Sequence, residues 1–277
     1  MITGEARCAS TLAVLCRCLR AWAAVATLLA MGTCAYAEST LDAIRARGVL
    51  RVGVKMDAAP FGSLDAAGRP IGFEIELARL FARVLLDDDA RVKFVPMTTA
   101  TRFGILQAGG IDLLVATVTA TEERRKLAEL SDPYFMSASL ILVPRASKVE
   151  ELADLGGRRV AVVRSSLQER DVAELQSRAL LVAVASAAEG VRAVKGGQAD
   201  AFAYDDVVLL RLAQHDPAFR VTGQPIGPRP YAVAARKGDA ELIRWVNGWL
   251  AKMRRDGSYG ELWRRYFAPF ESRLVGG

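Results

Sequence analysis

Apolar and polar positions along this chain follow two periods, one typical of strands and one typical of helices. Short apolar runs predict buried strands, whereas residues 71–86 carry apolar side chains along one broad face, as an amphipathic helix does. The first series comprises strands at 49–54, 92–97 and 111–116 with helices at 71–86 and 101–110. The second comprises strands at 158–164, 180–185 and 200–205 with helices at 167–178, 187–195 and 206–214. Such alternation predicts mainly parallel sheets with helices on both faces.

Two such series predict an α/β protein with two lobes. The extended stretches at 139–146 and 227–238 are expected to cross between the lobes, and the amphipathic pattern at 239–255 then returns the chain to the first lobe. We therefore expect lobe 1 to comprise two segments with lobe 2 between them. The expected bounds are 38–143 and 231–277 for lobe 1, and 144–230 for lobe 2.

The first 37 residues have the features of an export signal. Three arginines precede an apolar run at 21–31, and Ala-Tyr-Ala at 35–37 offers small residues where a signal peptidase cuts. The run has 11 residues, whereas a spanning helix needs about 20. We expect cleavage after Ala37 and a periplasmic mature chain. Cys34 ends a weak lipoprotein-like motif, and a lipid anchor there is not expected.

Composition excludes several kinds of site. All four cysteines lie in the leader, so the mature chain has no disulfide, thiol nucleophile or cysteine-bound metal. The single histidine, His215, lies in a polar turn and cannot form a catalytic triad or a multi-histidine metal site. A net charge of +6 with scattered basic residues does not indicate nucleic-acid binding. No phosphate-binding glycine motif follows a strand, and no cofactor is expected.

Residues 112–135 are the most informative segment of the chain. A short apolar strand is followed by a threonine-rich loop and by a predicted helix at 122–130 with acidic residues in its first turn. Arg124 therefore lies near a helix N-terminus, where its planar donors suit a carboxylate. Taken alone, the segment also fits a capped surface helix with solvated arginines. The rest of the chain favours the binding interpretation.

Eight segments in one order resemble the bacterial extracellular solute-binding proteins for polar amino acids, which are family 3 of the periplasmic binding proteins of ABC importers. The resemblance covers nearly all of the chain after residue 38 and implies the type II two-lobe fold with two crossing hinge strands. The segments are GVLRVGVK at 48–55, APFG at 59–62, GRPIGFEIELARLFA at 68–82, GGIDLLVATVTATEERRK at 109–126, LSDPYF at 130–135, LADLGGRRVAVVRSS at 152–166, GQADAFAYDD at 197–206 and DGSYGELWRRYF at 256–267.

Ligands of open α/β sheets bind beyond the carboxyl ends of the strands. The polar residues expected there are Lys55, Arg102, Thr117, Thr119, Arg124, Ser165, Ser166 and Asp205. The resemblance implies that Arg124 and Thr119 hold the α-carboxylate of an amino acid and that Asp205 binds its α-ammonium. It also implies that Ser165 and Ser166 donate backbone N–H groups from the second lobe.

Two positions depart from the family pattern. Ala58 stands where many members have an aromatic residue that stacks on the ligand, and Leu167 stands where threonine is common. Part of the usual ligand cage must then come from elsewhere. Candidates are Phe61, Phe73 and Tyr204, although each of these aromatic residues also fits an ordinary core.

Lys55 and Arg102 bear on specificity. Because Arg124 and Asp205 would already bind the carboxylate and ammonium of an amino acid, the further cations Lys55 and Arg102 indicate a ligand with a second anionic group. The pattern GVK followed by TxTR resembles members that bind aspartate and glutamate. The alternative is that Lys55 or Arg102 forms an ion pair with a protein carboxylate and never contacts ligand. The candidate carboxylates are Asp57, Glu74 and Asp206.

We therefore expect a monomeric glutamate- or aspartate-binding protein without catalytic residues that delivers its ligand to the membrane permease of an ABC importer. Two other classes stay open. One is a periplasmic cyclohexadienyl or arogenate dehydratase on the same fold, which would need a carboxylic acid such as Glu169 or Glu189 in the cleft. The other is a ligand-sensing module that reports to a membrane receptor.

Overall fold

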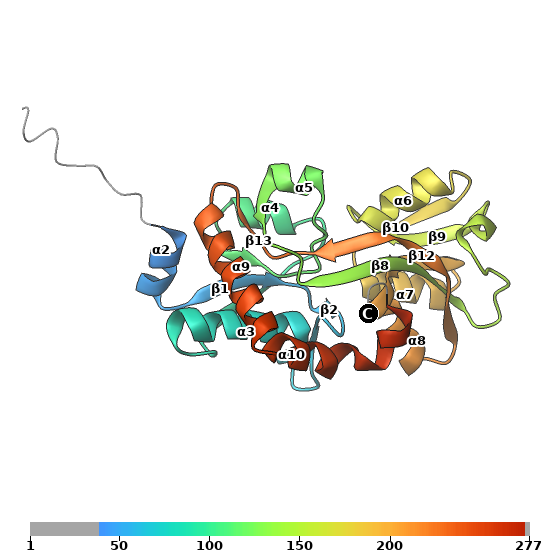
Figure 1. Cartoon of the computed structure of the whole chain (residues 1–277). Coiled ribbons are helices and arrows are strands. Elements are labelled where there is room, and N and C mark those ends of the chain that lie inside the picture. Colours follow the sequence, from blue (N-terminus) through green and yellow to red (C-terminus); the bar gives the residue numbers. More distant parts are fainter. Residues whose placement is uncertain (1–38, 275–277) are drawn as a thin grey trace, which may run out of the picture. The chain divides into compact units, whose positions relative to one another are not determined.

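The computed structural model describes residues 39–274. The expected leader and the lipoprotein-like motif at Cys34 lie outside these residues. Two five-stranded sheets and one small three-stranded sheet form the framework, and long strands pass between the two larger sheets (Figure 1). Because residues from Thr40 onward form one compact unit, the lobe bounds at 143/144 and 230/231 remain a proposal.

The first sheet has the order β5-β1-β6-β13-β7. Its β5, β1 and β6 strands pair in parallel, whereas β13 pairs antiparallel with both β6 and β7. Figure 1 shows α4 and α5 on one side of this sheet and α3 and α10 on the other. The elements are β1 (Leu50–Val54), α3 (Phe73–Leu86), β5 (Val92–Pro96), α4 (Arg102–Gln107), β6 (Leu113–Leu114), α5 (Glu122–Leu127), β7 (Ala128–Leu130), β13 (Ala234–Arg236), α9 (Ala240–Arg255) and α10 (Ser258–Phe267).

The second sheet has the order β10-β9-β11-β8-β12. Its β10, β9 and β11 strands are parallel, and the long strands β8 and β12 pair antiparallel along its edge. Helix α6 lies on one side of the sheet, with α7 and α8 on the other (Figure 1). The elements are β8 (Phe135–Pro144), β9 (Arg159–Val163), α6 (Leu167–Leu175), β10 (Leu180–Val184), α7 (Ala187–Lys195), β11 (Ala201–Asp205), α8 (Asp206–His215) and β12 (Phe219–Tyr231).

Short elements complete the fold. The small sheet pairs its three strands antiparallel, and helix α2 precedes β1. Two 3-10 helices follow β8 and α10. These elements are α2 (Thr40–Arg47), β2 (Asp57–Ala58), β3 (Gly62–Leu64), β4 (Pro70–Ile71), η1 (Leu152–Leu155) and η2 (Ala268–Arg273).

Side-chain caps explain where the helices near the sheet ends begin. The Ser166 hydroxyl accepts a hydrogen bond from the amide of Glu169 at 3.1 Å, and Ser186 does the same for Glu189 at 3.2 Å. The Thr121 hydroxyl accepts from the amide of Arg124 at 3.3 Å. Each bond satisfies a free amide of the first turn, so the three caps fix the first residues of α5, α6 and α7, of which α6 and α7 follow closely on β9 and β10.

The two sequence series correspond to the two sheets, with three differences. The predicted helix at 122–130 ends at Leu127, because Ala128–Leu130 pairs with β13 as a strand. The sheets are parallel only in part, since β8 and β12 pair antiparallel in the second sheet and β13 pairs antiparallel in the first. The expected crossing at 139–146 lies mostly in β8, which begins at Phe135, whereas the crossing at 227–238 spans the end of β12 and the separate short strand β13.

Candidate functional site

A small polar cavity lies where the carboxyl end of β11 and the start of α6 meet the loops that follow β1, β5 and β6. Its volume is only about 20 Å³, roughly the space of a single water. An amino acid could therefore enter only if the surrounding side chains moved apart. The lining residues are Lys55, Thr99, Arg102, Thr117, Thr119, Arg124, Ser166, Leu167, Gln168, Tyr204 and Asp205.

Two buried guanidinium groups face the cavity without a carboxylate partner among the described residues. Arg102 is 2% exposed and donates through Nη1 to the carbonyl oxygen of Ala116 at 2.8 Å, while its Nε has no partner. Arg124 donates through Nη1 to the carbonyl oxygen of Thr119 at 2.9 Å. Burial and then the charge of Arg102 lower the pKa of Arg124 to about 9, which leaves this guanidinium charged at neutral pH. Both guanidinium groups keep N–H donors that can donate hydrogen bonds to an anion.

Lys55 is more occupied than the two arginines. Its ammonium is buried, contacts the Tyr204 hydroxyl and lies 4.0 Å from the carboxylate of Asp57. Burial lowers the pKa of Lys55, and the charge of Asp57 opposes this shift. The predicted alternative of an ion pair with a protein carboxylate therefore describes Lys55 in part. It does not describe Arg102, for which no ion pair is found in the described residues.

Asp205 is the carboxylate of the cavity. It ends β11 and is buried, and its Oδ1 accepts a hydrogen bond from Gln168 Nε2 at 2.8 Å. The same Gln168 amide donates to the Ser139 hydroxyl at 2.9 Å, which orients it toward Asp205. Burial raises the pKa of Asp205, and the nearby charge of Lys55 lowers it. A ligand cation at this position would restore a charged partner to the carboxylate.

Eight of the ten predicted site residues line the cavity, and two do not. Ser165 lies just outside, where its amide donates to Glu169 Oε2 at 2.8 Å. Phe61 is fully buried in an aromatic cluster, with ring centroids 5.0 Å from Phe135 and 5.2 Å from Phe267. Phe61 therefore occupies a core position with three rings packed around it, outside the lining of the cavity, and its ligand contact stays a prediction.

Gln168 and Thr99 line the cavity, although neither was predicted from the sequence as a site residue. Gln168 follows Ser166 by two positions, so the helix start at α6 was the available signal. Thr99 gave no signal beyond its place in the threonine-rich loop before Arg102. Leu167, noted for departing from the family pattern, also faces the cavity.

Truncation of Phe61 tests its placement in the core. We expect Phe61→Ala to lower the free energy of unfolding by about 3–5 kcal/mol, because it opens a cavity among the three rings. Urea unfolding followed by tryptophan fluorescence measures this loss. Leu64→Ala, at a position 52% exposed, is the matched control and should change stability by less than about 0.5 kcal/mol. Normal stability with weakened ligand affinity would return Phe61 to the binding site.

The acids suggested for a dehydratase lie away from the cavity. The side chains of Glu169 and Glu189 fold back to the backbone just before their helices. Glu169 accepts a hydrogen bond from the Ser165 amide, and Glu189 accepts one from the Ala185 amide at 2.9 Å. Both bonds are exposed to solvent. Neither carboxylate is among the residues that line the cavity, so neither is placed to transfer a proton there.

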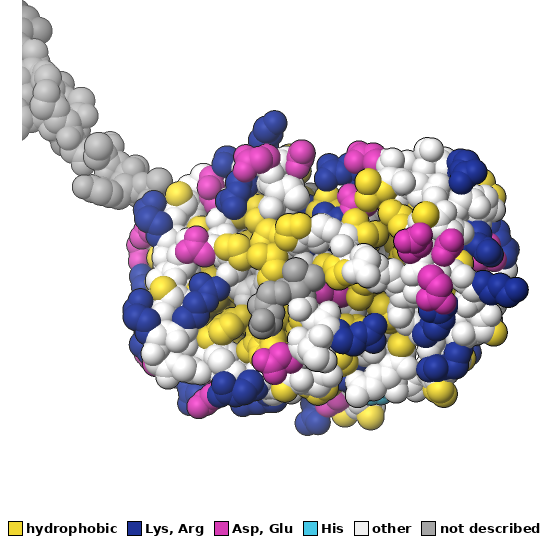
Figure 2. All heavy atoms as spheres, turned by 45° about the vertical axis from the view of Figure 1, so that its right-hand side comes forward, with side chains coloured by type: hydrophobic (Ala, Val, Ile, Leu, Met, Phe, Trp, Pro, Cys, Tyr) yellow, Lys and Arg dark blue, Asp and Glu magenta, His cyan; other side chains and the backbone are white. Residues whose placement is uncertain are grey.

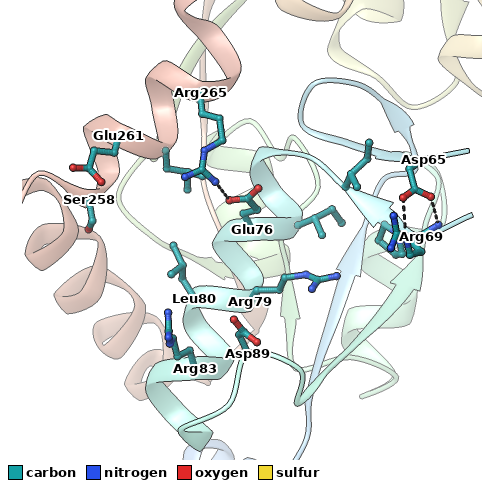
Figure 3. A pocket seen from close by; sticks show the side chains of 14 residues that line it. Asp65, Arg69, Glu76, Arg79, Leu80, Arg83, Asp89, Ser258, Glu261 and Arg265 are labelled. Atoms are coloured by element: carbon teal, nitrogen blue, oxygen red, sulfur yellow. Dashed lines mark hydrogen bonds and ion pairs between the residues drawn. The ribbon is translucent and has the colours of Figure 1, made fainter. Parts of the chain in front are cut away.

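A larger hollow of about 630 Å³ lies between α3, the β3–β4 hairpin and α10 (Figure 3). Four of its charged side chains form two ion pairs, Arg265 with Glu76 at 2.5 Å and Arg69 with Asp65 at 2.8 Å. Unlike the arginines of the small cavity, these two arginines are exposed and paired with carboxylates. The hollow is therefore a weaker candidate than the polar cavity, despite its size.

Neither the surface charge in view nor the metal-ligating side chains of residues 39–274 indicate a second site. Figure 2 shows Lys and Arg side chains interspersed with Asp and Glu over the visible face. Within residues 39–274, no group of three or more His, Cys, Asp or Glu side chains is placed to hold a metal ion. No helix in the same part of the chain is long and apolar enough to cross a membrane. The expectation that nucleic acid is not a partner stays a prediction.

Comparison with known proteins agrees with this geometry. Residues 50–269 match the model of the bacterial extracellular solute-binding proteins, family 3. A glutamine-binding protein of an ABC transporter from Bacillus subtilis is 35% identical over 231 residues, which cover 83% of this chain and 85% of that protein.

Two solved structures are also similar. The solute receptor for L-cysteine of Neisseria gonorrhoeae is 30% identical with a TM-score of 0.82, covering 86% of this chain and 98% of that one. An ancestral amino acid-binding protein, described as a precursor of cyclohexadienyl dehydratase, is 36% identical with a TM-score of 0.77, covering 83% and 100%. This chain belongs to the bacterial extracellular solute-binding proteins of family 3, has their two-lobe type II fold, and is an amino-acid-binding member of that ABC transporter family.

Proposed function

We propose that this protein binds L-glutamate or L-aspartate in the polar cavity and delivers it to the membrane permease of an ABC importer. The observation that carries the proposal is Arg102, a buried guanidinium with an unpartnered Nε and no carboxylate partner in the described part of the chain. A buried cation without a counter-ion is costly. An acidic ligand side chain would supply that counter-ion.

The ligand's common groups would be bound by other residues. Arg124 and the segment around Thr119 would hold the α-carboxylate, and Asp205 would receive the α-ammonium. Ser166, which caps α6, would contribute the helix start, where backbone N–H groups favour an anion. Thr117 and Tyr204 would complete the walls of the site. These roles are proposals that rest on the shared lining of the cavity.

Charge supports an acidic ligand over a basic one. The cavity contains Lys55, Arg102 and Arg124 against Asp205, so a ligand of charge −1 reduces the excess and a ligand of charge +1 increases it. At an effective dielectric of about 20, a unit pair near 4 Å contributes on the order of 4 kcal/mol. That magnitude is enough to reject arginine and lysine.

L-Glutamine is the second candidate. The contacts of Lys55 with Tyr204 and Asp57 reduce the cation excess, and the Bacillus subtilis relative is named for glutamine. A neutral amide oxygen could still accept from Arg102. The two candidates differ only in the charge of the ligand side chain.

Calorimetry on refolded, ligand-stripped protein tests the proposal. We expect one glutamate or aspartate per monomer with a Kd of about 1 μM or tighter, corresponding to roughly −8 kcal/mol or better. Glutamine, cysteine, histidine and arginine form the comparison panel. Binding of glutamine alone would establish the second candidate. Tight binding of arginine or histidine without response to either acid would overturn the charge argument.

The cellular setting is part of the same proposal. The leader at 1–37 would direct the mature chain to the periplasm, where it would act as a monomer. A role as a receptor's sensing module would use the same cavity and closure, with a different membrane partner. Turnover of a prephenate-like acid would instead identify a dehydratase, and we expect none because Glu169 and Glu189 lie outside the cavity.

A further inference from the structure

Glu74 is a fully buried carboxyl group directly behind the cavity. It lies in the first turn of α3, has 0% exposure and does not line the cavity itself. Its Oε1 accepts hydrogen bonds from the amide of Thr117 at 2.7 Å and from the Tyr134 hydroxyl. Its Oε2 has no partner. A buried carboxyl oxygen of this kind requires an explanation, because an unpaired polar atom away from water is costly.

The bonded oxygen of Glu74, Oε1, holds the backbone of Thr117. Thr117 lines the cavity with a φ of 46°, a left-handed conformation that a β-branched residue rarely adopts. Glu74 holds its amide, while Arg102 Nη1 holds its carbonyl oxygen at 3.4 Å and that of Ala116 at 2.8 Å. The segment is thus fixed from both sides, and surrounding contacts are what such a strained conformation needs to persist.

The charges around Glu74 are those that an acidic ligand would meet. Desolvation by burial raises the pKa of Glu74 to about 7, against the hydrogen bonds from Tyr134 and Thr117 and the charges of Lys55 and Arg102. A second anion in the cavity would compete with Glu74 for the same two cations. The titratable groups that act on Glu74, or on which it acts, are Lys55 after β1, Arg102 on α4, Tyr134 before β8 and Tyr204 on β11.

We propose that Glu74 is a positioning residue of the binding site, whose buried carboxyl fixes Thr117 in its left-handed conformation and takes up a proton when an acidic amino acid enters. The second half of this inference rests on the proposed function, and the first half holds for any amino acid. The protonated carboxyl keeps its hydrogen bonds through Oε1 and no longer competes with the ligand for Lys55 and Arg102. The site therefore exchanges one negative charge for another.

The sign of the pH dependence follows from linkage. An anionic ligand raises the pKa of Glu74 above its ligand-free value, so the protonated form binds the ligand more tightly. The contribution of Glu74 protonation to ligand affinity is constant below about pH 6. It falls as pH rises through the ligand-free pKa of Glu74, which is about 7. Between pH 6 and pH 8 the Kd for glutamate should rise by up to about tenfold, because a carboxyl with a pKa of about 7 is largely protonated at pH 6 and largely ionised at pH 8.

Three variants separate the two roles. Glu74→Gln keeps a carbonyl acceptor for the Thr117 amide but cannot titrate, so its glutamate Kd should match the native value at pH 6 and stay unchanged at pH 8. Glu74→Ala removes the acceptor and should weaken glutamate and glutamine alike, at least about tenfold at pH 6, where the native carboxyl is largely protonated. Glu76→Gln, two positions along the same helix and paired with Arg265, should retain the native pH profile.

Calorimetry at pH 6 and pH 8, repeated in buffers of different ionisation enthalpy, measures both affinity and proton uptake. Native protein should take up a fraction of a proton per glutamate near pH 7, and Glu74→Gln should take up less. Asp206, whose pKa burial raises to about 6, is present in every variant, so its titration cancels in this comparison. An identical pH slope in native protein and Glu74→Gln would overturn the proton-uptake role.

The positioning role has its own test. Thermal unfolding with circular dichroism first confirms that Glu74→Ala is folded; if it is not, Glu74→Asp replaces it, because the shorter side chain moves the acceptor away from the Thr117 amide while keeping the charge. Native affinity in the folded variant at pH 6 would overturn positioning. If native protein binds neither acid, the proposed function fails, while the positioning comparison is still made with whichever amino acid of the panel binds.

Discussion

Arg124→Ala is expected to abolish binding of every amino acid, acidic or neutral. The guanidinium is buried and forms no ion pair with a carboxylate in the described part of the chain. It donates to the carbonyl oxygen of Thr119 on the cavity wall. The α-carboxylate that it would hold is common to all amino acids. Removing one partner of a buried charged pair costs about 2–5 kcal/mol, so the loss of affinity should exceed roughly thirtyfold. Calorimetry with glutamate and with glutamine measures it.

The neighbouring arginines supply the contrasts for this experiment. Arg125→Ala removes an exposed guanidinium of the same helix, which pairs only with Glu122 at 3.8 Å, and should leave affinity unchanged. Arg102→Ala should weaken acidic ligands more than glutamine or asparagine, because Arg102 would face the ligand side chain. Full glutamate affinity in Arg102→Ala would make that arginine structural, and equal losses in Arg124→Ala and Arg125→Ala would remove the proposed carboxylate clamp.

Asp205→Asn is expected to weaken binding and also to reduce the fraction of closed protein. Arg102 and Arg124 belong to the helices of the first sheet, whereas Asp205 ends a strand of the second. A ligand held by both groups would bridge the two sheets and favour the state in which they approach. The neutral amide of Asn cannot form an ion pair with the ligand ammonium. The ligand then loses its contact with the second sheet and no longer bridges the two. A cavity of about 20 Å³ fits a closed state that must open to admit ligand.

Small-angle scattering with and without saturating glutamate measures this closure. The radius of gyration of native protein should fall on ligand addition, and that of Asp205→Asn should fall less at matched occupancy. Asp216→Asn, at a half-buried carboxylate that forms the C-cap of α8 and pairs with Lys195 at 3.0 Å, should behave as native. A native radius of gyration that ligand does not change would favour a rigid, already closed pocket over the two-lobe clamp.

Local patterns were sufficient to predict most elements of the two sheets. The apolar runs and helical faces gave β1, α3, β5, β9, α7 and β11 within about two residues, because burial of one face imposes a period that the sequence must carry. The extended crossings at 139–146 and 227–238 were predicted, but their antiparallel pairing was not. Pairing partners of β7, β8 and β12 are far apart in sequence, and no local pattern records which distant strand supplies the hydrogen bonds.

The sequence by itself determined the chemistry available to this protein. One histidine and no cysteine beyond residue 34 leave charged and hydroxyl side chains at the strand ends as the main polar groups of the predicted site. Order along the chain was enough to place Arg124 and Thr119 beyond a strand end of the first sheet and Asp205 at a strand end of the second, since parallel βα units place the carboxyl ends of their strands at one edge of each sheet.

Only the tertiary structure decided which of these residues share the cavity and which have partners. Phe61 was an even choice between ligand and core until three aromatic rings were found around it. Lys55 and Arg102 looked equivalent in sequence, yet Lys55 lies 4.0 Å from Asp57 whereas Arg102 has an unpartnered Nε. Glu74 gave no sign of a role behind Thr117. Burial and pairing depend on contacts between distant segments, and these contacts set the free energy of a charge in the interior.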